Sequence, residues 1–172
     1  MRSVRILMFG ALLLAGCDDD PLTSRTPGEP APPAQGIQAF LQVDNDRARP
    51  GDVVRVWVKV QIGGETDARL GSYTGRLRFA PASLQYVSEA AMDDGMRVTN
   101  PAGAPQGDLR FAGASPTGFT QLTLYEATFT VQKEGYLDGL RLEMEEVSAA
   151  LSLTNLTPAL RVAPQVFLRA GN

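Results

Sequence analysis

Apolar and polar residues alternate with a period of two through most of the chain after residue 36. The stretch "VVRVWVKVQ", residues 53–61, has a valine at 54, 56, 58 and 60, and side chains two positions apart point to the same face of a strand. "GSYTGRLRF" (71–79) and "LTLYEATFTVQ" (122–132) alternate in the same way, with charged and hydroxyl side chains on the second face. This pattern is typical of antiparallel sheets that pack one face on a core and expose the other.

About nine such strands are predicted, separated by turns rich in Gly, Pro, Asn and Asp. No segment after Gly16 has a convincing helical period, and "DDG" at 93–95 is read as a hairpin turn before the next strand. The fold class expected is all-β, a single β-sandwich. Its strands are predicted at residues 37–43, 53–61, 71–79, 84–87, 96–99, 109–112, 122–132 and 140–144, with a last strand from 159–163 and 166–168.

The outer face of the strand at 53–61 poses a question about Trp57, the only tryptophan of the chain. The alternation places Trp57 beside Arg55 and Lys59, on the side that should face water. Two interpretations are open. Either a loop or the chain's own N-terminal segment covers the ring, or the ring is presented to a partner, by stacking on a sugar or by anchoring a protein interface.

The first residues predict export and lipid attachment. Arg2 and Arg5 precede an apolar run, Ile6 to Leu14, which is too short to cross a bilayer and is typical of a signal peptide. The run ends in "LAGC", which resembles the lipobox of bacterial lipoproteins. We therefore expect residues 1–16 to be the signal peptide and Cys17, the only cysteine, to be lipidated; an ordinary signal peptide cleaved near a cysteine is the alternative. The expected location is a bacterial cell envelope, with the protein held to a bilayer through acylated Cys17 on the periplasmic or cell-surface side.

Residues 17–36 are predicted to be a tether, because "PLTSRTPGEPAPPAQG" (21–36) has five prolines and no apolar period. Proline-rich linkers are stiff and extended, at about 3 Å per residue. The remaining residues, 37–172, are enough for one domain with its own core.

Composition excludes several kinds of function. The formal charge of -3 becomes -5 once Arg2 and Arg5 are removed with the signal peptide, and an acidic chain with no basic cluster argues against a nucleic-acid partner. The chain has no histidine, which excludes Ser-His-Asp catalysis and the commonest zinc sites. Glu143, Glu145 and Glu146 could offer carboxylate chemistry, but on a strand the first two are surface neighbours about 7 Å apart. We expect no enzyme and no cofactor.

A weak candidate for a calcium site comes from "DND" and the residues that follow it. Asp44, Asp46 and Asp52 could supply oxygen ligands, but calcium needs six to eight oxygens. Asx turns at the end of a strand are the favoured interpretation.

The order of motifs over residues 37–168 is similar to the cohesin domain of cellulosomal scaffoldins and to related carbohydrate-binding β-sandwiches. The stretches that carry the resemblance are "RPGDVVRVWVKV", "GSYTGRLRFAPASLQYVS", "GDLRFAGAS" and "LYEATFTV". The resemblance implies a nine-stranded antiparallel jelly-roll sandwich that does no chemistry and binds a partner on an exposed sheet face, which in cohesins proper is a dockerin domain. Ser72 and Thr74 stand where that family commonly has Asn and Asp, and Ala80 stands where Asp precedes the proline. These departures argue against dockerin binding of the usual kind.

The function expected is therefore that of a non-catalytic binding module on an envelope lipoprotein. Its partner would be a protein domain or a polysaccharide, the latter linked to polysaccharide breakdown; a structural spacer or assembly subunit is the alternative. One candidate surface is formed by Arg55, Trp57 and Lys59, and the other by Ser72, Thr74, Arg76 and Arg78.

Overall fold

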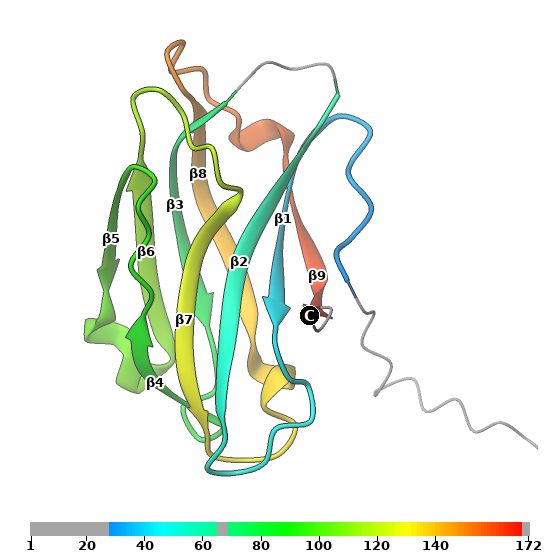
Figure 1. Cartoon of the computed structure of the whole chain (residues 1–172), viewed down its shortest axis with the longest axis vertical. Coiled ribbons are helices and arrows are strands. Elements are labelled where there is room, and N and C mark those ends of the chain that lie inside the picture. The colour runs from blue at the N-terminus through cyan, green and yellow to red at the C-terminus, as the bar shows by residue number, and fades with distance from the viewer. Residues whose placement is uncertain (1–27, 65–68, 170–172) are drawn as a thin grey trace, which may run out of the picture.

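The computed structural model describes residues 28–64 and 69–169, which form a sandwich of two β-sheets (Figure 1). Sheet A has the order β4-β7-β2-β1-β9, and sheet B has the order β5-β6-β3-β8. Sheet A consists of β4 (Leu84–Glu89), β7 (Thr123–Val131), β2 (Val53–Gly63), β1 (Gly36–Val43) and β9 (Leu160–Leu168). Sheet B consists of β5 (Met96–Asn100), β6 (Asp108–Ala114), β3 (Leu70–Arg78) and β8 (Arg141–Ala149).

The core lies between the sheets and is built from the alternating positions that the sequence predicts. The valines at 54, 56, 58 and 60 all point into it and are buried. Phe129 of β7 packs its ring against Phe79 at 5.0 Å and against Tyr86 at 5.9 Å between centroids. The all-β two-sheet sandwich expected from the period of two is confirmed.

All nine strands occur where they are predicted, with changes at their ends. β8 continues to Ala149, five residues beyond its expected end, and β9 is one continuous strand. Every strand pair is antiparallel except β1 with β9, which is parallel. The chain passes from β8 of sheet B to β9 of sheet A, so these two strands are not joined by a hairpin within one sheet. The direction of β9 is therefore not forced to be antiparallel to its neighbour β1. The described residues also form three 3-10 helices that the sequence did not predict: η1 (Pro101–Gln106), η2 (Tyr136–Gly139) and η3 (Thr157–Ala159).

The hairpin predicted at residues 93–95 is wrong, because β4 and β5 lie in different sheets. The segment belongs to a crossover along one side of the sandwich (Figure 1). Asp94 fixes it there: its carboxylate accepts hydrogen bonds from the backbone N–H of Thr120 at 2.6 Å and of Gln121 at 2.9 Å. A turn-forming aspartate therefore anchors a long connection instead of closing a short one.

Within the part of the chain that the structure describes, no helix has the length and apolar character needed to cross a membrane.

We expect Phe129→Ala to lower the free energy of unfolding by about 3–5 kcal/mol, because the substitution removes a fully buried ring and leaves a cavity between the sheets. Urea denaturation followed by circular dichroism measures the loss. Val53→Ala is the matched control, since 61% of Val53 is exposed, and it should change the same quantity by no more than about 0.5 kcal/mol. Similar losses for the two variants would contradict this assignment of the core.

Candidate functional site

Trp57 lies on the outer face of sheet A, as the strand alternation predicts, but only 5% of it is exposed. In the sheet it stands between Gln42 of β1 and Glu126 of β7. The guanidinium of Arg169 lies over the ring, 4.7 Å from its centroid. The backbone N–H of Arg169 donates to the carbonyl of Val43 at 2.7 Å, which continues the pairing of β9 with β1 and fixes the arginine in place.

The ring is therefore covered, which was one of the two interpretations of Trp57, and the residue that stacks on it comes from the end of the chain. A small hollow of about 210 Å³ remains beside the ring, lined also by Lys59 and Met92. A sugar cannot stack on the indole face that Arg169 occupies. Arg55 is exposed. Binding of a partner by Trp57 and Arg55 stays a prediction.

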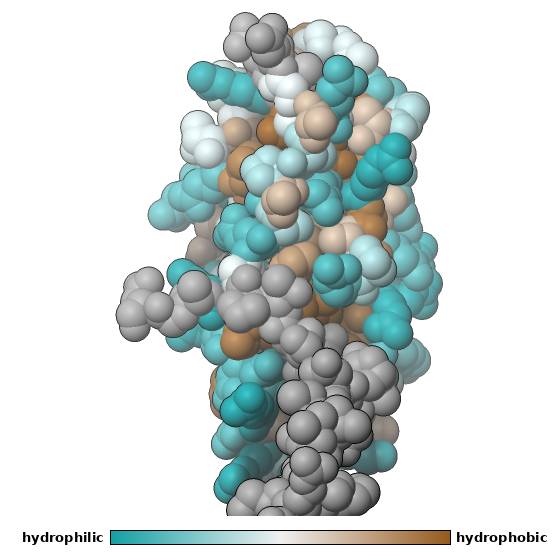
Figure 2. All heavy atoms as spheres, turned by 90° about the vertical axis from the view of Figure 1, so that its right-hand side faces the viewer, coloured by the Kyte–Doolittle hydropathy of each residue, from teal (hydrophilic) through white to brown (hydrophobic). Residues whose placement is uncertain are grey.

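The last part of the predicted tether also lies on sheet A. Glu29 forms an ion pair with Lys59, and the side-chain amide of Gln61 donates to the carbonyl of Pro30 at 3.0 Å. Gly28 donates its backbone N–H to Leu168 at 2.8 Å. Figure 2 faces this side of the molecule and shows mainly polar side chains, with apolar residues only in separate patches between them.

The segment approaches β2 so closely that one position requires glycine. A Cβ atom on Gly63 would lie 1.7 Å from the carbonyl oxygen of Pro33. Beneath this side of sheet A, Phe40 of β1 and Phe167 of β9 meet edge to face at 5.7 Å and are both buried. The outer face of sheet A thus carries its own small apolar cluster with a cover.

The second predicted surface lies on the outer face of sheet B, and the structure brings its four residues together. Ser72, Thr74, Arg76 and Arg78 all project from β3, the first three half-buried and Arg78 exposed. Arg76 is paired on both sides, with Glu145 of β8 and with Asp108 of β6 at 3.3 Å. The bond to Glu145 is the main cause that raises the pKa of Arg76.

Arg78 pairs with Glu143 at 2.8 Å. The two strand-neighbouring glutamates therefore act as partners of the β3 arginines. Their arrangement is that of surface ion pairs, not of two carboxyl groups facing each other across a cleft.

An exposed apolar strip, which the sequence did not reveal, lies next to these ion pairs. Met96 and Val98 of β5 are 76% and 63% exposed. Across β6, the register places Val98 in one row with Ala112 and Thr74. Along "MRVTN", Met96 and Val98 point outward and Arg97 points inward.

The three aspartates considered for calcium do not form a metal site. Within residues 28–64 and 69–169, no three acidic side chains gather as they would around a metal ion. Asp44 accepts the backbone N–H of Arg55 at 3.0 Å, and Asp52 accepts that of Arg49 at 2.8 Å. These bonds fit the turn interpretation of Asp44 and Asp52; Asp46 takes part in no metal cluster either.

Cys17 and the signal peptide lie outside the described residues, so lipidation stays a prediction.

No protein-family model matches the chain, and neither does any curated protein. Solved structures do match. The sixth cohesin of scaffoldin B from Acetivibrio cellulolyticus, solved with a mutant Cel5 dockerin, is 17% identical with a TM-score of 0.53, over 78% of this chain and 99% of that one. A cohesin from Clostridium thermocellum, in the complex of OlpA with a dockerin, is 14% identical with a TM-score of 0.55, over 78% and 99%.

The fold is cohesin-like. A non-cellulosomal cohesin from the archaeon Archaeoglobus fulgidus matches as well, at 14% identity and a TM-score of 0.52, over 78% of this chain and 86% of that chain. The resemblance to cohesins predicted from the motif order is thus confirmed at the level of the fold.

We expect Arg169→Ala to expose Trp57 in the cohesin-like sandwich. Because the chain has a single tryptophan, its fluorescence reports on this ring alone: the emission maximum should shift to longer wavelength, and acrylamide should quench it faster. Arg161→Ala, within β9, is the control and should leave both unchanged. Unchanged quenching in Arg169→Ala would mean that other groups cover the ring.

We expect Asp94 to make stability depend on pH in the acid range. The backbone N–H of Gln121, helped by that of Thr120, lowers the pKa of Asp94 below its usual value, although partial burial opposes the effect. A carboxyl group whose pKa is lower in the folded state stabilises the fold above its unfolded pKa of about 3.8, and this contribution is lost as the pH falls through the folded value.

The free energy of unfolding of Asp94→Ala should therefore lie below that of the native chain at pH 7, and the gap should narrow below about pH 4. Urea titrations over this pH range measure it. Exposed Asp93 offers the control, Asp93→Ala, for which we expect little gap at any pH. A gap for Asp94→Ala that is constant down to low pH would rule out the ionic contribution.

Proposed function

We propose that this chain is a lipid-anchored docking module of a bacterial cell envelope, which binds a protein domain on the outer face of sheet B and catalyses no reaction. The observation that carries the proposal is the difference between the outer faces of the two sheets. On sheet A, β1 is buried on both faces and Trp57 is covered. On sheet B, the exposed strip of Met96 and Val98 lies beside paired arginines.

This arrangement matches the anatomy of protein interfaces, in which an apolar centre has a polar and charged rim. The arginines contribute too, because arginine is enriched at interfaces and here its charge is already oriented by carboxylates on both neighbouring strands. The solved cohesins of like fold support a protein partner, since several are complexes with dockerins. Anchoring is supported by the "LAGC" motif that ends in Cys17.

Polysaccharide capture is the weaker candidate. Sugar stacking needs a free aromatic face, and Arg169 occupies the face of Trp57. Capture would require the arginine to move away, whereas the outer face of sheet B needs no rearrangement.

A photo-cross-linking residue at position 98 of the full chain, expressed in its native host, tests the proposal. We expect one discrete protein adduct, because Val98 lies at the centre of the proposed contact. The same residue at position 53, exposed at the start of β2, is the control and should give none. Thr74→Arg, which puts a bulky charge in the row of Val98, should reduce the adduct at least about tenfold, corresponding to the loss of one interface contact.

Three results would overturn the docking assignment. Equal adducts from positions 98 and 53 would show nonspecific contact. If the native chain and Thr74→Arg are both retained on insoluble polysaccharide, the chain binds carbohydrate at a surface other than the outer face of sheet B. If the protein adduct forms equally well in Thr74→Arg, a spacer role in a larger assembly is favoured.

A further inference from the structure

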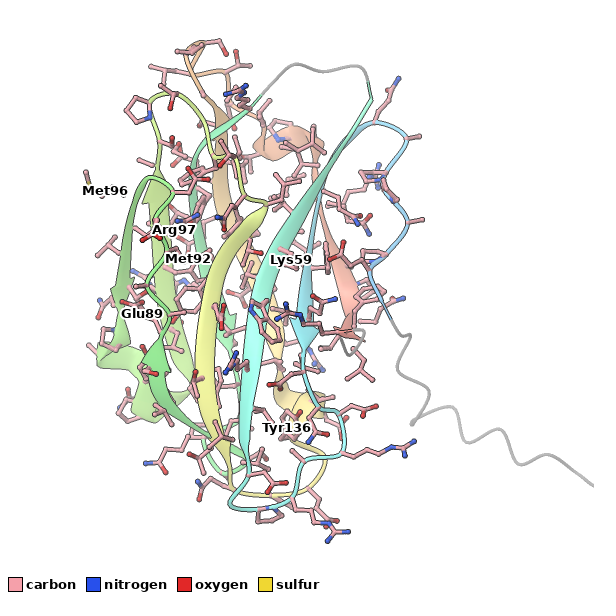
Figure 3. The ribbon with its side chains drawn as sticks, in the orientation of Figure 1. Lys59, Glu89, Met92, Met96, Arg97 and Tyr136 are labelled. Atoms are coloured by element: carbon pink, nitrogen blue, oxygen red, sulfur yellow. The ribbon has the colours of Figure 1, made fainter. Side chains whose placement is uncertain are left out.

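A cleft of about 370 Å³ opens on the side of the sandwich where the edge strands β4 and β5 lie. Its walls are the inner sides of β5 and β7 together with the crossover that follows β4. In Figure 3, Glu89, Met92 and Arg97 gather on this side, whereas the side chain of Met96 extends outward from β5. This cleft lies between the sheets and is separate from the outer face of sheet B.

Arg97 is the one residue of β5 that brings a charge to this cleft. Its Nε donates to the hydroxyl of Tyr73 at 3.1 Å, its Nη2 donates to the carbonyl of Thr123 at 3.4 Å, and the guanidinium stacks on Phe119 at 4.9 Å. Its Nη1 is buried and has no hydrogen-bond partner. Among residues 28–64 and 69–169, no carboxylate forms an ion pair with Arg97.

Neither of the two acidic groups near the cleft forms an ion pair with Arg97. Asp94 is close enough for Arg97 to contribute to its lowered pKa, but its carboxylate is bonded to Thr120 and Gln121. Glu89 lines the cleft and is exposed. A half-buried guanidinium without a paired carboxylate is costly, because water no longer solvates it fully.

A second unsatisfied donor borders the same cleft. Tyr125 is only 5% exposed, and its hydroxyl is buried without a hydrogen-bond partner. Burial is the main cause that raises the pKa of Tyr125, so the hydroxyl keeps its proton. The hydroxyls of Thr99 and Tyr86 are near enough to affect this pKa, but neither meets the geometry of a hydrogen bond to it. Four buried side-chain polar atoms of the described residues lack partners, and the two whose residues line this cleft, Nη1 of Arg97 and the hydroxyl of Tyr125, can both donate a hydrogen bond. These two groups therefore lack an acceptor.

The missing group can be described by its chemistry. A carboxylate only accepts hydrogen bonds, has two oxygens for two donors, and carries the single negative charge that balances one arginine. A phosphate dianion would bring twice the negative charge beside Glu89 and Asp94, and a water molecule would bring no charge to pair with Arg97. Much of the remaining lining is apolar, including Phe111 and Leu124, and the volume is in the range of small-ligand sites.

We propose that this cleft binds a carboxylate carried on a short apolar stem, with Nη1 of Arg97 and the hydroxyl of Tyr125 as its donors. Both donor atoms are buried, and both residues line the cleft. Met92 also lines it, and because a methionine side chain is flexible the cleft can adjust its width to admit the stem. This inference does not depend on the proposed docking face. If the chain binds a protein partner but no carboxylate, the carboxylate site is refuted and the docking proposal is unaffected.

Butyrate is the probe, and butyramide is its uncharged counterpart of nearly the same shape. The full chain, labelled with ¹⁵N in its arginines and held in detergent micelles, is titrated with each. The Nε–H signal of Arg97 is identified by its loss in Arg97→Lys. We expect butyrate to shift this signal saturably and to raise the melting temperature, and butyramide to do neither at the same concentrations.

Tyr125→Phe keeps the ring and removes only the hydroxyl, so it should fold and bind butyrate about tenfold more weakly, as expected for a lost hydrogen bond to a charged group. Tyr136→Phe is the control, because that hydroxyl donates to the carbonyl of Asn45 and Tyr136 does not line the cleft, so its affinity should match the native chain's. Equal shifts with butyrate and butyramide, no saturable shift with butyrate, or unchanged affinity in Tyr125→Phe would each overturn the proposal.

The carboxylate could belong to a small acid or to an acidic side chain of a protein. Acetyl-Val-Glu-Val-amide and its Gln analogue separate these sources. If the Glu peptide binds more tightly than butyrate and the Gln peptide does not bind, the site is assigned to an acidic segment of a protein. If butyrate binds more tightly, the site is assigned to a small acid.

Discussion

The hydroxyl of Tyr73 connects the two layers of this protein. Tyr73 belongs to β3 of sheet B, and its hydroxyl donates to the carbonyl of Leu124 in β7 of sheet A at 2.5 Å. The same oxygen accepts the bond from Arg97, so one atom joins both sheets and orients the only charge of β5. Room for the ring depends on Gly113, where a Cβ atom would lie 2.5 Å from it. This contact joins the two sheets beside the lateral cleft and holds Arg97 against its lining.

The two outer faces are used differently, and the reason is where the chain ends lie. Both described ends of the chain meet sheet A, where Gly28 bonds to Leu168 and Arg169 lies on Trp57. Sheet B receives no such cover among the described residues, and its outer side chains are satisfied by one another through Arg76 and Arg78. A surface of this kind is ordered before any partner arrives, which lowers the entropy cost of binding.

The sequence predicted the strands well because nine alternating segments with turn residues between them leave little choice of fold. It predicted the faces less well. Alternation divides a strand into two sides but does not say which side is inner, and in a five-residue edge strand such as β5 an aliphatic arginine stem can take the inner side while Met96 and Val98 stay outside. The cover of Trp57 was unpredictable in detail, since Arg169 is 112 residues away and the pairing of β9 with β1 that brings it there has no local signal.

The segment from residue 28 to residue 33 acts as a strap at one edge of sheet A. It bonds to Gln61 of β2 through Pro30 and to Leu168 at the end of β9 through Gly28. Leu168 is followed directly by Arg169, the residue that covers Trp57. The strap therefore holds in place not only its own residues but also the end of the strand from which the cover of Trp57 comes. Releasing the ion pair between Glu29 and Lys59 would loosen the strap and, with it, the position of Arg169.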